Sequence, residues 1–103
     1  MAHVAVLARL RATEGKGDEL IAAFQPLVEQ AQSEPGTLLY VLNRSKKDPD
    51  VLWCSELYAD DDAFAAHSGS EAMTKAAPAL GPLIAESELV VSEPVLSKGL
   101  PPS

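Results

Sequence analysis

The sequence predicts an α+β domain of the ferredoxin-like class, with the element order β-α-β-β-α-β. Three observations lead to this prediction. Four β-rich segments alternate with two helical stretches, the two middle β-rich segments are separated only by the polar turn "SKKDPD", and the length of 103 residues suits one domain. We therefore expect a four-stranded antiparallel sheet with the helices on one face.

The first third of the chain supplies a strand and a helix. Residues 3–11, "HVAVLARLR", are β-rich and should form the first strand. Apolar side chains then recur at helical spacing, with Asp18 and Glu19 in the favourable first turn, so a helix is expected over 17–33. The "SEPG" turn ends this helix, because the residue before a proline avoids helical backbone.

The rest of the chain supplies three strands and the second helical stretch. The strands are expected over 37–44, 51–58 and 86–95. Asp60 is placed as the N-cap of a short helix that ends near His67, and Ser70 can cap another short helix after it. We assign residues 1–96 to one domain and 97–103 to a flexible C-terminal tail.

The two hairpin strands are apolar on both of their faces. In the strand 51–58, Trp53 and Leu57 fall on one face, while Cys54 and Tyr58 fall on the other. Helices on one side of the sheet can cover only one of these faces. A second copy of the sheet, packed face to face, would cover the other, which predicts a homodimer; the alternative is a monomer with an unusually apolar sheet.

Charge and composition argue against several function classes. The net charge of −7 disfavours nucleic acids and anionic membranes as partners, and no apolar run approaches the ~18 residues that a bilayer-spanning helix needs. A single cysteine, Cys54, cannot form an internal disulfide, so we expect a cytoplasmic setting. His3, Cys54 and His67 lack metal-ligand spacing, and no nucleotide-binding glycine motif is present, so we expect no metal site.

Three stretches of the chain together resemble the antibiotic biosynthesis monooxygenase (ABM) domain, over roughly residues 3 to 95. They are "VAVLARLRATEGKGDELIAAF", "SEPGTLLYVLNRSKKDPDVL" and "SELYADDDAFAAHSGSEAM". The resemblance implies a dimeric α+β barrel. Among the activities of the family, it implies cofactor-free oxygenation of quinols or aromatic polyketides, and hence no cofactor.

Two departures from the family narrow this expectation. Where the haem-degrading branch carries an asparagine and a haem-ligating histidine, this chain has Ala8 and Ala77, so haem degradation is not expected. The family's Glu-x-Trp at the end of the third strand is present as Glu56-Leu57-Tyr58, which keeps an aromatic ring but lacks the indole.

His67 is the first catalytic candidate. Oxygenation without a cofactor needs a base, a dry pocket and donors that hold an oxyanion, and imidazole titrates near neutral pH. His67 follows Phe64 by three positions, so both side chains should point toward the sheet if Phe64 packs inward. The alternative is a histidine that merely occupies a helix C-terminus, where the helix dipole favours it.

Glu56 is the second catalytic candidate. It lies on a strand with apolar neighbours, where a carboxylate must be paired or carry a raised pKa. It either pairs with Arg9 or Arg44, or it orients His67 or a substrate hydroxyl.

The candidates for substrate binding share an aromatic side chain; they are Tyr40, Tyr58, Trp53 and Phe64.

The sequence thus predicts a homodimeric monooxygenase that oxidises a small hydroquinone- or anthrone-like aromatic with molecular oxygen. Two alternatives stay open, because a fold does not fix a function. One is a non-oxidative isomerase or lyase that acts on a small polar metabolite. The other is a non-catalytic dimeric binding or stress-associated protein.

Overall fold

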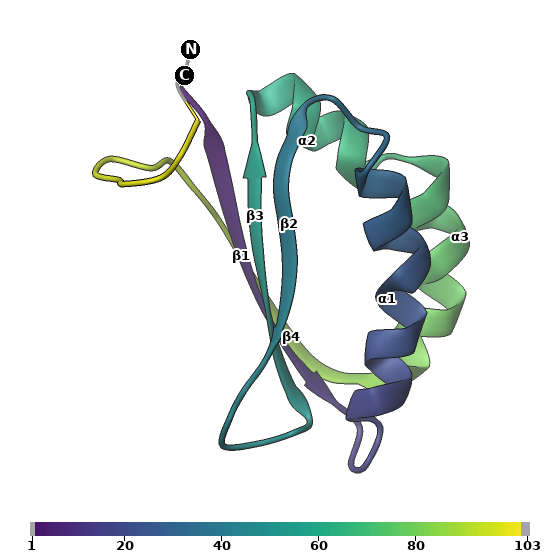
Figure 1. The fold of residues 1–103 in the computed structure, drawn as a ribbon. Helices are drawn as coiled ribbons and strands as arrows, with labels where there is room; N and C mark the ends of the chain where they lie inside the picture. The colour runs from purple at the N-terminus through teal and green to yellow at the C-terminus, as the bar shows by residue number, and fades with distance from the viewer. Residues whose placement is uncertain (1, 102–103) are drawn as a thin grey trace.

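The computed structural model describes residues 2–101 and confirms the ferredoxin-like α+β fold. In chain order the elements are β1 (Val4–Ala12), α1 (Gly17–Ala31), β2 (Thr37–Arg44), β3 (Val51–Tyr58), α2 (Asp61–Ser68), α3 (Glu71–Leu80), a 3₁₀ turn (Gly81–Leu83) and β4 (Ile84–Ser92). The strands pair antiparallel in the order β2-β3-β1-β4. All the helices lie against one face of this sheet, α1 beside α3, with α2 near the end where β3 finishes (Figure 1).

The second helical stretch is two helices because it contains two caps. The Asp60 carboxylate accepts a hydrogen bond from the Ala63 amide at 2.8 Å, and the Ser70 hydroxyl accepts one from the Met73 amide at 3.2 Å. Each bond satisfies an amide that a helix start leaves without an intrahelical partner. Within the described residues, no helix combines the length and the hydrophobicity that crossing a bilayer requires.

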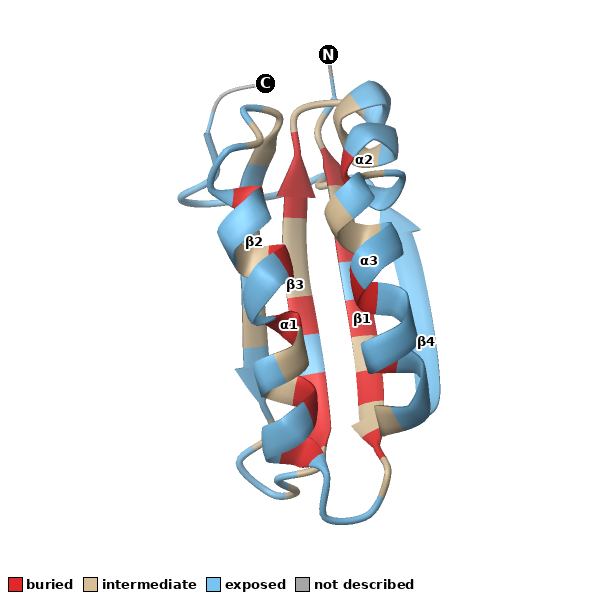
Figure 2. Ribbon diagram, turned by 90° about the vertical axis from the view of Figure 1, so that its right-hand side faces the viewer, coloured by how far each residue is buried: buried red, intermediate tan, exposed pale blue. Residues whose placement is uncertain are grey.

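The core lies between the sheet and the helices. Even-numbered residues of β1 and β3 face the helices, and Leu52 and Val6 are fully buried there. Leu20 and Leu27 of α1 pack onto this face, so the buried positions run along β1, β3 and the inner side of α1 (Figure 2). Alternation along the strands and helical spacing in α1 place these side chains in one layer.

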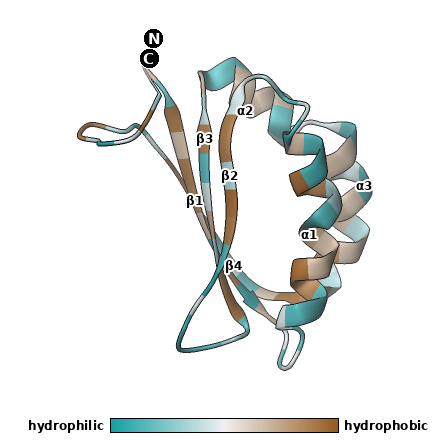
Figure 3. Cartoon of the chain, in the orientation of Figure 1, coloured by the Kyte–Doolittle hydropathy of each residue, from teal (hydrophilic) through white to brown (hydrophobic). Residues whose placement is uncertain are grey.

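The opposite face of the sheet, which we call the outer face, is also apolar. Its large exposed side chains are Leu7, Leu39, Val41, Trp53 and Val90. Figure 3 shows apolar residues along β1, β2 and β3, and none of the helices that residues 2–101 form lies on this side (Figure 1). The prediction that Trp53 and Tyr58 lie on opposite faces is confirmed, since Trp53 is 46% exposed and Tyr58 is fully buried on the helix side.

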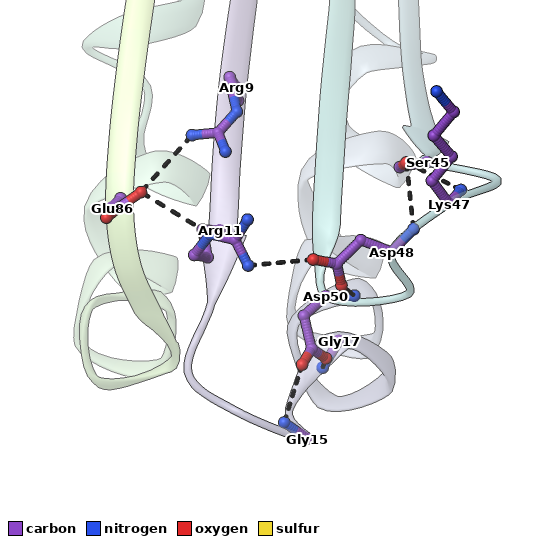
Figure 4. A network of polar contacts seen from close by, with 9 residues as sticks. All are labelled: Arg9, Arg11, Gly15, Gly17, Ser45, Lys47, Asp48, Asp50 and Glu86. Carbon is purple, nitrogen blue, oxygen red and sulfur yellow. Dashed lines mark hydrogen bonds and ion pairs between the residues drawn. The ribbon is translucent and has the colours of Figure 1, made fainter.

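At the end of the sheet far from α2, polar contacts fasten the loops together (Figure 4). The Asp50 carboxylate accepts hydrogen bonds from the amides of Gly15 and Gly17, at 2.9 and 3.0 Å. Gly17 has no room for a side chain, because a Cβ atom there would collide with the Pro49 carbonyl oxygen. The loop between β1 and α1 is therefore held directly against the β2–β3 hairpin.

Candidate active site

His67 lies in the last turn of α2 with its ring turned inward. Only 3% of the residue is exposed. Its ring centroid lies 4.9 Å from that of Tyr40 on β2 and 5.3 Å from that of Tyr58 on β3. The inward direction expected from the spacing to Phe64 is confirmed, and the histidine is not a solvent-facing helix end.

Glu34 holds the imidazole ring of His67. Its Oε1 accepts a hydrogen bond from His67 Nδ1 at 2.8 Å and another from the Thr37 hydroxyl at 2.8 Å. Burial alone would raise the pKa of Glu34, but the hydrogen bonds and the charge of His67 outweigh it and hold the pKa below its ordinary value. Glu34 is therefore an acceptor-only carboxylate, so Nδ1 carries the proton in this bond.

A close contact at Gly36 places α2 beside the turn that carries Glu34. The Gly36 carbonyl accepts a hydrogen bond from the Ala59 amide at 2.9 Å. A Cβ atom at position 36 would lie only 2.5 Å from the Cβ of Ala63, in the first turns of α2. The absence of a side chain at Gly36 lets α2 approach the turn that carries Glu34.

The second ring nitrogen of His67, Nε2, is buried and makes no hydrogen bond with any described residue. In a neutral imidazole whose Nδ1 is protonated, Nε2 carries the free lone pair. Most buried polar atoms in proteins have a partner. A buried, basic nitrogen without one is what a general base requires before its substrate arrives.

Glu56 does not pair with either predicted arginine, so that prediction is wrong. Arg9 lies 3.6 Å from Glu86, and Arg44 lies 2.5 Å from Asp18. Glu56 Oε1 instead accepts a hydrogen bond from the Tyr58 hydroxyl at 2.5 Å.

The environment of this pair changes the pKa of both groups. Burial raises the pKa of Glu56, although the hydrogen bond from Tyr58 and the nearby charge of His67 act in the opposite direction. Burial also raises the pKa of Tyr58, and the bond to Glu56 raises it further. The pKa of Tyr40, opposite Glu56 in the sheet, is raised mainly by burial. Both tyrosines are therefore protonated and able to donate hydrogen bonds at neutral pH.

The structure gathers most of the predicted site residues but leaves one apart. Phe64 is half-buried against Tyr58, with 5.1 Å between ring centroids. Trp53 lies on the outer face, away from His67 and the tyrosines. Cys54 is buried, and burial raises the pKa of its thiol to about 12, so it is a core residue and not a nucleophile.

Glu34 and His67 also line a surface pocket of about 330 Å³ between the α1–β2 turn and α2. Its polar lining includes Gln30, Ser33, Thr37 and Ser70. Among residues 2–101, no cluster of three or more histidine, cysteine or acidic side chains could hold a metal ion. Glu34 is not among the predicted site residues; in the sequence it belongs to the turn that ends a helix and to a stretch that resembles the ABM domain.

The chain is similar to several solved structures, and two of those described below are candidate antibiotic biosynthesis monooxygenases. The chain is 34% identical to a candidate antibiotic biosynthesis monooxygenase from Chloroflexus aurantiacus, with a TM-score of 0.80 and coverage of 95% of this chain and 98% of that one. A candidate antibiotic biosynthesis monooxygenase from Caulobacter crescentus is 32% identical, with a TM-score of 0.85 and coverage of 92% of both chains. A protein from Shewanella oneidensis is 25% identical, with a TM-score of 0.87 and coverage of 93% and 94%.

No curated protein matches the chain. Residues 3–79, three quarters of the sequence, match the family described as antibiotic biosynthesis monooxygenase. This match includes α1, the Glu34 turn, both hairpin strands and the helix that carries His67. The chain therefore belongs to the antibiotic biosynthesis monooxygenase family.

Proposed function

We propose that this protein is a cofactor-independent monooxygenase that oxidises a small hydroquinone- or anthrone-like aromatic with molecular oxygen. One observation carries the proposal: a buried histidine whose Nδ1 is held by a carboxylate while Nε2 has no partner among the described residues. Membership of the ABM family supports the class of reaction. Tyr40, Tyr58 and Phe64 supply aromatic surface against which a substrate ring would pack.

In this proposal His67 first acts as a base. Nε2 takes a proton from the substrate, and the resulting carbanion or phenolate supplies the electrons that triplet oxygen needs. A carbon–oxygen bond forms, and the peroxide anion takes the proton back from Nε2 to give a hydroperoxide. Nε2 then removes the remaining C–H proton of that carbon, so the carbonyl forms as the oxygen–oxygen bond breaks and hydroxide leaves. That hydroxide takes the second proton from Nε2 and becomes water. One oxygen atom enters the product and one enters water, so no external reductant is needed for an anthrone-like substrate.

The surrounding groups have separate parts in this scheme. The Tyr40 hydroxyl, which remains protonated, would donate to the substrate oxyanion as it forms. Burial of the site would keep bulk water from the reactive intermediate. Glu56 would hold Tyr58 in place through their hydrogen bond.

We further propose that the protein works as a cytoplasmic homodimer in which two outer faces pack together. The support is the row of exposed apolar side chains around Trp53 on a side of the sheet that no helix covers. Trp53→Glu should give a monomer in sedimentation velocity, whereas Lys75→Glu on the exposed side of α3 should leave the dimer intact. A wild-type monomer, or a dimer that survives Trp53→Glu, would contradict this assembly.

Oxygen uptake over a panel of hydroquinones and anthrones, with metals chelated, tests the reaction. His67→Ala should lower uptake by about a hundredfold or more. His3→Ala is the matched control, because His3 contacts the carbonyls of Ala59 and Pro101 and takes no part in the site. Uptake unchanged in His67→Ala would remove the histidine from the mechanism. No uptake by the wild type would favour a non-oxidative isomerase or a binding protein.

A further inference from the structure

We infer that Glu34, held by Thr37, is a positioning residue that fixes His67 with its proton on Nδ1 and its lone pair on Nε2. The inference deepens the proposed function, because it assigns Nε2 of His67 as the base and Glu34 as the residue that selects this tautomer. The expected effect of Glu34 on the reaction rate rests on the proposed function, whereas its effect on the protonation of the His67 ring does not.

Two hydrogen bonds meet at one carboxylate oxygen of Glu34. Oε1 of Glu34 accepts from both Nδ1 of His67 and the Thr37 hydroxyl, each at 2.8 Å. Two donors from different elements leave that oxygen little freedom to move: Thr37 begins β2, and His67 lies in the last turn of α2. The bond from Thr37 therefore fixes the Glu34 carboxylate relative to the sheet, and the carboxylate in turn fixes the imidazole.

Burial distinguishes this arrangement from a surface ion pair. The His67 side chain is 4% exposed and that of Glu34 is 16% exposed. A hydrogen bond in such surroundings is weakly screened, and it is charge-assisted when the acceptor is ionised. An ionised carboxylate cannot donate, so only the tautomer with a proton on Nδ1 satisfies it.

The unpartnered Nε2 indicates that the arrangement has more than a structural role. A histidine that served only to tie α2 to the α1–β2 turn would need one nitrogen for Glu34 and a second partner for the other. Here Nε2 is buried without a partner among residues 2–101, while the aromatic rings of Tyr40 and Tyr58 lie beside the imidazole. When Nε2 accepts a proton, the imidazolium that forms has the Glu34 carboxylate already in place beside it.

The tautomer can be measured without any substrate. Long-range ¹H–¹⁵N NMR spectra distinguish protonated from unprotonated ring nitrogens. In the wild type, neutral His67 should show a protonated Nδ1 and an unprotonated Nε2. Glu34→Ala removes the acceptor and should release the ring to a mixture of tautomers. His3, which lacks a carboxylate acceptor, serves as an internal reference in the same spectra.

The rate effect is measured on the same proteins once a substrate is found. Glu34→Gln should lower kcat by about tenfold to a hundredfold, as expected for loss of an orienting partner. Thr37→Val, which removes only the hydroxyl, should lower kcat by roughly threefold to tenfold. Thr37→Ser keeps the hydroxyl and should restore most of the loss. Because the Thr37 variants keep both members of the pair, they retain the test if the Glu34 variants fold poorly.

The outcomes separate the two proposals. A wild-type His67 protonated on Nε2 would overturn the inference whatever the activity. The expected tautomer together with unchanged kcat in Glu34→Gln would also overturn it, since the carboxylate would then have no part in the rate. If no substrate is found, the proposed function fails, and the comparison of wild type with Glu34→Ala still decides whether Glu34 selects the tautomer.

Discussion

The contact between Gly36 and Ala63 provides the sharpest test of how the site is built. Gly36 has no positive φ, so replacing it by alanine costs nothing through backbone strain. The cost is steric: the new Cβ would lie 2.5 Å from the Ala63 Cβ, so α2 must move away by about 1 Å to reach ordinary contact. Overpacking of this kind destabilises a protein by about 1–3 kcal/mol.

A second substitution should reverse that cost. Ala63→Gly removes the opposing methyl, and the new Cβ at position 36 then lies 3.4 Å from the Ala63 Cα, an ordinary contact. Alone, Ala63→Gly should cost about 1 kcal/mol through lower helix propensity. The double variant should be more stable than the sum of the single effects by about 1–2 kcal/mol.

Denaturant unfolding of the four proteins in this cycle measures the coupling free energy. Gly81→Ala is the control, since nothing lies within 4 Å of a Cβ at Gly81 and its φ is negative. That substitution should be neutral or slightly stabilising. Additivity of Gly36→Ala and Ala63→Gly within about 0.3 kcal/mol would refute the steric reasoning. So would a Gly36→Ala protein as stable as the wild type.

Three further predictions follow from burial and hydrogen bonding. The folded-state pKa of Glu56 lies above its unfolded value, so its ionisation lowers stability as pH rises through that pKa. Glu56→Gln should therefore raise Tm at pH 7, and the gain should vanish below the ordinary carboxyl pKa of 4.5. Asp50→Ala deprives two loop amides of their acceptor and should cost about 1–2 kcal/mol in urea unfolding, whereas an unchanged midpoint would show that water replaces the carboxylate. Cys54 should react with a thiol reagent only as fast as the protein unfolds; rapid reaction of the native protein at neutral pH would contradict its burial.

Local signals in the sequence were enough to predict the fold. Asp60 and Ser70 cap helices through bonds to residues three positions on, which a short window of sequence shows. The alternation of side chains along β3 predicts that Trp53 and Tyr58 lie on opposite faces. The helical spacing of Phe64 and His67 predicts that His67 points inward, and the structure confirms both predictions. Each of these predictions depends on contacts between near neighbours in the chain.

The partners within the site depend instead on how distant segments dock. Glu34 precedes His67 by 33 positions, and no periodicity links them. Arg9 and Arg44 are the wrong partners for Glu56, because the sequence alone does not define the strand register. Arg9 lies on the outer face, opposite to Glu56, and Arg44 pairs across the sheet with Leu52, several residues away from Glu56 along β3.

The burial of Nε2 of His67 bears on the rate at which a substrate could reach it. α2 has only eight residues, too few for a helix to persist without its tertiary contacts. Under the proposed function, opening of those contacts would expose Nε2 to a substrate, and local opening of this kind also exposes the helix amides to hydrogen exchange. The opening rate of α2, measured by exchange, would then set a ceiling on turnover by this route. A substrate consumed faster than that ceiling must enter by a route that leaves α2 in place.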